Sequence, residues 1–441
     1  MTYKLLKVNL TLRVQIRKTI SKISLLGNYS DLISGVSAKL EDIKTGREKK
    51  LTAHVLRNVL TVTSTPLTTP YSFFTVHDRF APASIILEKN VHLLSIDKEQ
   101  VKYLRFNKDL DILNLRKHPI LFLAQLMNAK EVIILPRKEF DRIMNKIDID
   151  DREVVWFFHT IRCGSTVWGQ IFDSLPQWTV ISESQALYHT VVYARKEVDI
   201  SAFSKTKEYE DMVVAAIKSY VRMAPKGHSI FWKTAPVDDH MLEVIRRRFP
   251  CHKILFGYRN ALPCALSFEK AFGWLPSVQR RLRYVMNAIA NVPPSTGEAR
   301  VGWLFHTQGY NPDLTVKAVR TSKLTFNTFE WFVLLWAIKI TMIQEFEANG
   351  GKFKPIKYES LMKNPREVIS GVFDYVNVPK NFVETALKTM ECDSQAGLFF
   401  SHKNRASFKS WQRSNETVQR CNDVLKVFDL PSLDSSYTIP F

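Results

Sequence analysis

The fold of this chain is decided by the stretch VVWFFHTIRCGST, residues 154–166. Its first five residues, 154–158, are all apolar, as expected of a strand that is buried on both faces of a parallel sheet. Apolar residues then recur at helical spacing over residues 167–175, so a helix follows the strand. Gly164 therefore lies in a short loop that joins a strand to the N-terminus of a helix. Backbone N–H groups and the helix N-terminus can surround an anion at such a place.

Strands and helices continue to alternate toward the C-terminus. The predicted strands are residues 229–232, 254–258 and 355–358, and a long aromatic-rich helix is predicted over residues 329–346. This alternation indicates an α/β fold, a parallel sheet with helices on both faces. A further helix is predicted between the first two of these strands, with Asp238 or Asp239 as its N-cap. Its inward residues are Met241, Leu242, Ile245 and Phe249.

Residues 1–150 differ in pattern from the rest of the chain. Residues 119–127 are predicted to be helical and residues 132–135 extended, and no catalytic constellation is evident among them. We therefore expect two units, an N-terminal α+β appendage of unknown role over residues 1–150 and a catalytic domain over residues 151–441. A substrate-shaping or interaction role suits the appendage best.

The loop at residues 159–166 holds the parts of a phosphate site. Gly164 permits close approach of the backbone, Arg162 adds a fixed guanidinium fork, and Ser165 and Thr166 supply hydroxyl donors. It is not the loop of the nucleoside triphosphatases, because their Gly-Lys-Ser/Thr ending is absent. An ordinary strand-to-helix turn is the alternative interpretation.

A second motif is LFGYRNALPCALSF, residues 255–268. Arg259 stands at the end of the predicted strand, and Ser267 follows eight positions later in a predicted helix. The guanidinium can hold a phosphate through two N–H bonds while the serine hydroxyl donates from the facing helix. A surface ion pair and a surface hydroxyl are the alternative.

Three shorter segments complete the pattern. FWKTAP, residues 231–236, sets Lys233 directly after an apolar strand, and KYESLMKNP, residues 357–365, joins a strand to a helix. The segment KNRASFKSW, residues 403–411, is basic, and a solvated loop would explain it equally well.

Together these motifs resemble those of the sulfotransferases that use 3′-phosphoadenosine 5′-phosphosulfate, over residues 150–415. Two departures occur in the loop, where Ile161 replaces a proline and Cys163 replaces a serine. The resemblance implies a sulfotransferase fold, which is similar to that of the P-loop nucleoside triphosphatases. It also implies contacts to the donor nucleotide by Arg162, Cys163, Gly164, Ser165, Thr166, Arg259, Ser267, Lys403 and Arg405.

Sulfuryl transfer requires positive charge around the transferred group and a base for the acceptor proton. We expect Lys233 and Arg162 to supply the charge, since FWKTAP resembles the Lys-Thr-His-Leu-Pro segment of cytosolic sulfotransferases. Ala235 stands where those enzymes have their catalytic histidine, so another residue is the base or the protein is inactive. Glu183 lies 21 positions after Arg162, the spacing of the glutamate in tyrosylprotein sulfotransferases. It is the predicted base, with His240 as second choice and an ordinary ion-paired glutamate as the alternative.

Charge and composition narrow the class of partner. The chain has 62 Lys and Arg against 43 Asp and Glu, a formal charge of +19, which favours anionic partners such as nucleotides and acidic glycans. No stretch approaches the roughly 20 apolar residues that span a bilayer. The five cysteines are scattered and lack metal-ligand spacing, so no metal site is indicated. We expect a cytoplasmic protein, and the basic N-terminus also fits a mitochondrial presequence.

The sequence thus predicts an enzyme that moves a sulfuryl group from 3′-phosphoadenosine 5′-phosphosulfate to an acceptor hydroxyl. The alternative is a catalytically inactive nucleotide-binding or interaction module on the same fold. Nucleic acid is not an expected partner, because no recognition motif or aromatic stacking platform accompanies the charge. The acceptor is unidentified. The basic residues Arg280, Arg281 and Arg283 suit one that is acidic or already sulfated, and a solvent-exposed helix face would explain them equally well.

Overall fold

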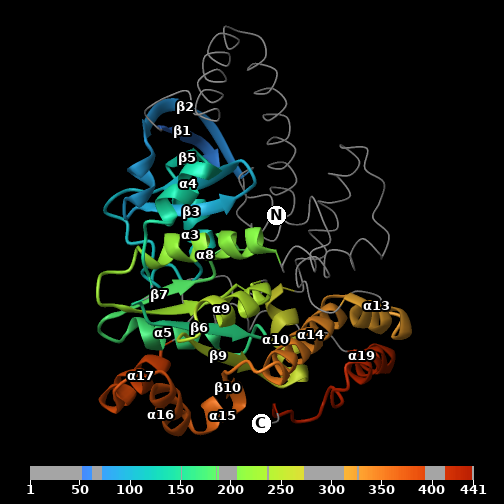
Figure 1. Ribbon diagram of the computed structural model, residues 1–441. Coiled ribbons are helices and arrows are strands. Elements are labelled where there is room, and N and C mark those ends of the chain that lie inside the picture. The colour runs from blue at the N-terminus through green and yellow to red at the C-terminus, as the bar shows by residue number, and fades with distance from the viewer. Residues whose placement is uncertain are drawn as a thin grey trace, which may run out of the picture.

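The protein is built on two five-stranded sheets that lie one above the other with a helix between them (Figure 1). The computed structural model describes residues 52–61, 72–149, 151–184, 186–187, 206–235, 238–272, 312–324, 327–392 and 413–439. The strand order is β2-β1-β5-β4-β3 in the first sheet and β10-β9-β6-β8-β7 in the second.

The first sheet is antiparallel throughout and belongs to the N-terminal part of the chain. Its strands are β1 (Thr52–Thr61), β2 (Phe73–Pro82), β3 (Val91–Ile96), β4 (Gln100–Arg105) and β5 (Glu131–Pro136). The helices of this unit are η2 (Ala83–Leu87), α3 (Leu121–Asn128) and α4 (Arg137–Met144). The predicted helix at residues 119–127 and strand at residues 132–135 are confirmed as α3 and β5, and the unit is the expected α+β appendage.

The second sheet is parallel throughout, as predicted. Its strands are β6 (Val154–His159), β7 (Trp178–Ser182), β8 (Ser229–Lys233), β9 (Lys253–Tyr258) and β10 (Lys354–Lys357). The last strand ends one residue earlier than predicted, because Tyr358 already begins a helix. The predicted aromatic helix at residues 329–346 is α14 (Thr328–Ala348).

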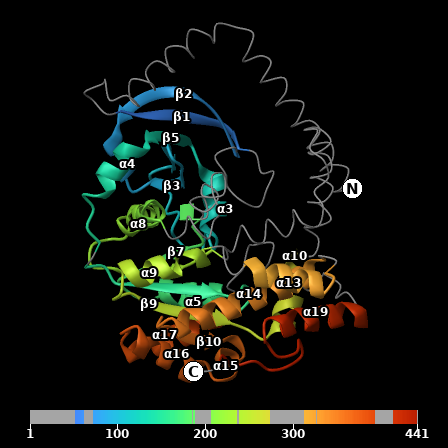
Figure 2. The same ribbon diagram turned by 45° about the vertical axis from the view of Figure 1, so that its right-hand side comes forward.

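Helices cover both faces of the parallel sheet (Figure 2). Val155 and Phe157 of β6 pack into the core under α5 (Ser165–Asp173) and α16 (Pro365–Tyr375), whereas Trp156 and Phe158 enter the core on the opposite face. The other helices are α8 (Lys207–Val221), η3 (Asp239–Met241), α9 (Leu242–Arg248), α10 (Ala261–Phe272), α13 (Pro312–Thr321), α15 (Tyr358–Lys363), η4 (Lys380–Phe382), α17 (Val383–Met390) and α19 (Asn415–Val427). Burial on both faces is why the strand sequence is apolar without alternation.

The two sheets share one hydrophobic core through α8. This helix lies between them in both views, and its residues are buried on the side facing each sheet. The Tyr220 hydroxyl donates to the carbonyl of Leu93 in β3 at 2.7 Å, and the Tyr103 hydroxyl lies 3.0 Å from Ser219 Oγ. The antiparallel unit thus packs directly on α8, the helix that lies between it and the parallel sheet.

One predicted helix start is wrong in detail. Neither Asp238 nor Asp239 caps a helix with its side chain, and α9 begins at Leu242 after the short helix η3. The Asp238 carboxylate instead accepts the backbone N–H of Ala235, and Asp239 pairs with a lysine of α14. No helix in the described part of the chain is long and apolar enough to cross a membrane.

Strand order places the predicted phosphate loop at a topological switch point. Strand β6 lies in the centre of the sheet, with β8 on one side and β9 on the other. In open α/β sheets, ligands bind outside the carboxyl ends of the strands at such a point. The loops that follow β6, β7, β8 and β9 therefore form the candidate site.

Candidate active site

The loop after β6 has a conformation that few residues adopt. Ile161 and Arg162 have φ values of 65° and 55°, and Gly164, the N-cap of α5, has a φ of 82°. The left-handed region costs a β-branched residue such as Ile161 about 1–3 kcal/mol, so the surrounding structure must hold it there. No side chain caps α5. A curled backbone before an uncapped helix N-terminus is the arrangement in which N–H groups converge on an anion.

His159, the last residue of β6, holds the curled loop in place. Its Nδ1 accepts the N–H of Ile161 at 3.1 Å, so the neutral ring carries its proton on Nε2, which donates to the carbonyl of Thr234 at 3.1 Å. Burial, reinforced by the charges of Lys233 and Lys339, lowers the pKa of His159 well below its usual value. His159 is therefore a neutral link between the loop and the end of β8.

Cys163 faces the core beneath the loop. Its side chain is buried against Gly257, and burial raises the pKa of the thiol to about 11. A protonated, buried thiol is a poor nucleophile, which excludes thiol chemistry as the use of this loop. Contact of Cys163 with a donor stays a prediction that concerns its backbone N–H.

Lys233 and Glu183 meet directly over the start of α5. Lys233 Nζ lies 2.5 Å from Glu183 Oε1 and donates to Thr166 Oγ1 at 3.3 Å. The lysine side chain is only 2% exposed, whereas the glutamate is 15% exposed. Glu183 has a φ of 56°, and its N–H donates to the Lys233 carbonyl at 2.9 Å. Three predicted site residues from the ends of β7 and β8 and from α5 are thus brought together.

Arg162, Ser267 and Arg259 form a second group on the other side of the loop. Arg162 Nε donates to Ser267 Oγ in α10 at 3.1 Å, and Arg259 Nη1 donates to the Arg162 carbonyl at 3.5 Å. Arg259 Nε is buried without a hydrogen-bond partner, 3.9 Å from Glu359 Oε1. Two guanidinium groups and one carboxylate leave a net positive charge beside the loop, which suits a phosphate.

The segment after β10 contributes residues to which the sequence analysis gave no role at the site. The ring of Tyr358 lies against the Arg259 guanidinium, whose carbon atom is 4.5 Å from the centroid of the ring. A Cβ on Gly164 would lie 2.9 Å from the same ring, so this position requires glycine. Trp336 of α14 donates its indole N–H to the Arg259 carbonyl at 2.9 Å, and no local sequence signal indicated that role.

The residues present fit the donor nucleotide that the motifs imply. The uncapped helix, the loop backbone and the cations at positions 162 and 233 suit a phosphosulfate, and Arg259 with Ser267 suits a second phosphate. Ala235 offers no base, since its side chain is a methyl group, and its backbone N–H donates to buried Asp238 at 2.8 Å. The His240 side chain, Lys403, Arg405 and the basic residues 280–283 lie outside the described residues.

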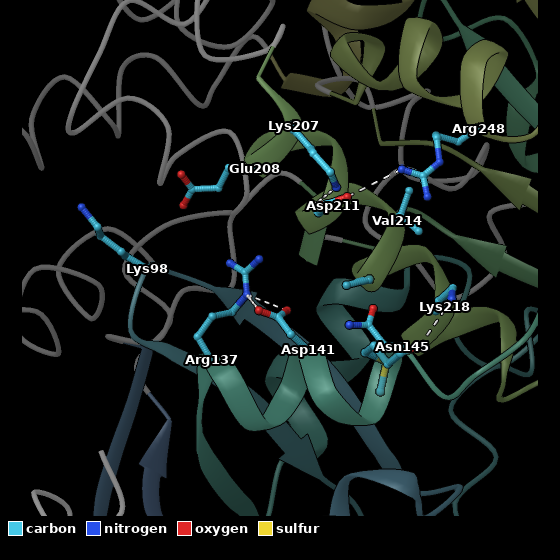
Figure 3. Close-up of a pocket in the computed structure, with 12 residues that line it drawn as sticks. Lys98, Arg137, Asp141, Asn145, Lys207, Glu208, Asp211, Val214, Lys218 and Arg248 are labelled. Atoms are coloured by element: carbon cyan, nitrogen blue, oxygen red, sulfur yellow. Dashed lines mark hydrogen bonds and ion pairs between the residues drawn. The ribbon is translucent and has the colours of Figure 1, made fainter. Parts of the chain in front are cut away.

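A separate cavity of about 670 Å³ lies between α4 and α8 (Figure 3). It contains none of the predicted site residues. Two of its cations are paired with its own acids, Arg137 with Asp141 at 2.8 Å and Lys207 with Asp211 at 2.7 Å. The candidate site therefore stays at the carboxyl edge of the parallel sheet, where the predicted residues meet.

The solved structures to which this chain is similar include several sulfotransferases. A sulfotransferase domain from the olefin synthase of Synechococcus PCC 7002 is 14% identical, with a TM-score of 0.33 and coverage of 61% of this chain and 93% of that one. A sulfotransferase from Alicyclobacillus acidocaldarius is 9% identical, with a TM-score of 0.32 and coverage of 64% and 97%. A sulfotransferase from Mycobacterium avium is 12% identical, with a TM-score of 0.35 and coverage of 66% and 81%.

No protein-family model matches the chain, and no curated protein matches it in sequence. At such low identities and TM-scores, the structural likenesses decide nothing about activity. The function of this chain has to be argued from its own site.

Proposed function

We propose that the chain is a sulfotransferase that moves a sulfuryl group from 3′-phosphoadenosine 5′-phosphosulfate to an acceptor hydroxyl. The observation that carries the proposal is the contact of Lys233 Nζ with Glu183 Oε1 at 2.5 Å and with Thr166 Oγ1 at 3.3 Å. It supports the proposal because a carboxylate, a cation and the start of α5 lie within one hydrogen-bonded cluster. Residues so far apart in sequence meet because three parallel strands end at the same edge.

Each residue has a role that its position supports. A bond forms between the acceptor oxygen and sulfur while the bond from sulfur to the bridging phosphate oxygen breaks. Glu183, a carboxylate in the ion pair, accepts the hydroxyl proton, and Lys233 stabilises the charge that develops on the bridging oxygen. Arg162 and the N–H groups at the start of α5 hold the phosphosulfate, while Arg259 and Ser267 hold the 3′-phosphate. The products are a sulfated acceptor and 3′-phosphoadenosine 5′-phosphate.

A second candidate is a module that binds the nucleotide without turnover. Two observations favour it: Ala235 replaces a base, and Cys163 turns a buried thiol away from the loop. The two candidates share the nucleotide site and differ in whether Glu183 does chemistry. An experiment has to separate binding from transfer.

The test is calorimetric binding of 3′-phosphoadenosine 5′-phosphate, followed by transfer of radiolabelled sulfate to a panel of hydroxyl acceptors that includes acidic glycans. We expect Arg259→Ala to weaken binding about 10- to 100-fold, because a hydrogen bond to a charged group is worth about 1.5–3 kcal/mol. Lys253→Ala is the matched control, since Lys253 lies at the opposite end of the same strand, β9.

The outcomes separate the candidates. Binding that survives Glu183→Gln, together with transfer that this variant loses, supports the sulfotransferase. Binding without transfer to any acceptor supports the binding module. Absence of binding by folded protein contradicts both.

A further inference from the structure

A buried ion pair lies beneath the site and takes no part in the proposed chemistry. Lys339, in the middle of α14, pairs with Asp239 of η3, and their side chains are 0% and 1% exposed. Replacing such a pair by well-packed apolar residues is often neutral or stabilising, because removing two charges from water is costly. Stability alone therefore does not explain why α14 carries a lysine at this point.

Asp239 belongs to the segment that continues from Lys233. Ala235 donates its N–H to the Asp238 carboxylate at 2.8 Å, and its carbonyl accepts the N–H of Asp238 at 3.0 Å. The Met241 N–H donates back to the Asp238 carbonyl at 3.0 Å. The segment is closed on itself by these bonds, so anchoring Asp239 also anchors the chain that leaves Lys233.

Lys339 belongs to a helix that reaches the other loops of the site. Trp336 precedes it by three positions and so lies on the same face of α14. Its indole N–H donates to the carbonyl of Arg259, in the loop after β9, at 2.9 Å. Arg259 in turn donates from Nη1 to the carbonyl of Arg162, in the loop after β6, at 3.5 Å. One helix thus bears on the loops after β6, β8 and β9.

We propose that Lys339 and Asp239 are positioning residues. Through α14 they hold the chain that follows Lys233 in place relative to the 159–166 loop. The inference rests on the proposed function for its kinetic consequences. Its structural content, the fixed geometry of two loops, stands independently of catalysis.

The test compares the full chain with the double variant Lys339→Met, Asp239→Leu, whose side chains fill the space without charge. We expect thermal unfolding at or near the parent temperature, and faster hydrogen–deuterium exchange in peptides covering residues 154–166 and 229–235. We expect kcat to fall about 10- to 100-fold with little change in KM, since a displacement of about 1 Å costs about 10²-fold in rate.

Two further variants keep the test decisive. Lys339→Met with Asp239→Asn also leaves no charge unpaired, keeps the shape of the aspartate, and serves if the first double variant does not fold. Arg420→Met with Glu330→Leu is the control, because this 2.7 Å ion pair joins the start of the same helix to α19. It should leave exchange in both loops and kcat unchanged.

Parent-like exchange in both loops and parent-like kcat in the folded double variant would overturn the proposal. If the parent itself transfers no sulfate, the proposed function fails, and hydrogen exchange alone decides whether the pair positions the loops. If exchange in the two loops is also faster in the control variant, the Lys339–Asp239 pair only stabilises α14 in a general way. That result would equally overturn the proposal.

Discussion

The two sheets differ in the charged residues that they bury and in the backbone strain of their loops. In the described residues of the antiparallel unit, 52–149, no residue has a positive φ, and no lysine or carboxylate is buried. In the described parts of the chain beyond residue 150, the loops after β6 and β7 contain strained residues. The lysines and carboxylates buried there are Lys233, Asp238, Asp239, Glu330 and Lys339.

The ionisable groups buried in the antiparallel unit are of a different kind. Burial, reinforced by His77, lowers the pKa of His54 to about 4, and burial, reinforced by Arg222, lowers that of His92 to about 3. Neutral imidazoles add no charge to the core. Buried charge and backbone strain are costly. The parallel unit places Lys233 and the strained residues Ile161, Arg162 and Glu183 at the carboxyl edge of its sheet, where the proposed chemistry uses them.

The largest expected effect separates two glutamates of similar exposure, one in each sheet. Glu183 is 15% exposed and pairs with Lys233, whereas Glu131 is 19% exposed and pairs with Arg105. We expect Glu183→Gln to lower kcat by about 10²- to 10⁴-fold, because a positioned base contributes that much. Glu131→Gln should leave kcat unchanged, as measured by initial rates of sulfate transfer. Equal rates for the two variants would erase the functional contrast between the sheets.

A smaller effect separates the two edges of the parallel sheet. Gly164, at the carboxyl edge, and Gly227, before β8, both have a φ of 82°. A Cβ at residue 164 would meet the Tyr358 ring at 2.9 Å, whereas one at residue 227 would meet no neighbour. We expect Gly227→Ala to lose about 1–2 kcal/mol of stability from backbone strain alone, and Gly164→Ala to lose more and to weaken nucleotide binding. Urea unfolding measures the loss of stability, and calorimetry measures nucleotide binding. Equal values for the two variants would contradict close packing of the loop at Gly164.

The third contrast concerns pH, and the sign of the pH dependence differs between the units. His92 is neutral in the folded state and has a pKa of about 3, below the value near 6.5 of an unfolded histidine. Its contribution to stability is present above pH 6.5 and is lost as the pH falls toward 3, by up to about 1.4 kcal/mol per pH unit. His92→Phe should flatten this part of a stability curve measured by urea unfolding.

Asp238 should act in the opposite direction. Burial raises its pKa well above the usual value for aspartate, and the charges of Asp239 and Glu183 act in the same sense. Its contribution is present below about pH 3.8, the unfolded value, and is lost as the pH rises toward the folded pKa. Asp238→Asn keeps an acceptor for the Ala235 N–H and should remove this dependence. If His92→Phe and Asp238→Asn changed the dependence of stability on pH in the same sense, the contrast between the two residues would be contradicted.

Much of the site was predictable because its signals are local. An apolar run followed by a glycine loop and a helical period predicts β6, the loop and α5 without knowledge of the rest of the chain. Glu183 was predicted from a family spacing, and its meeting with Lys233 follows from parallel strands that end at one edge. The side-chain cap at residues 238–239 was predicted wrongly, because the Asp238 carboxylate accepts the N–H of nearby Ala235 and Asp239 pairs with Lys339 of α14, a contact that only packing supplies.

The sequence by itself determined the parallel sheet, the place of the anion-binding loop and the candidate residues, since these depend on periodicity and on residues close together in the chain. Only the tertiary structure decided that α8 joins two sheets in one core, that Tyr358 covers Gly164, and that Trp336 and Lys339 reach the loops. These contacts join residues far apart in sequence. No local pattern encodes them, because each depends on how whole elements pack.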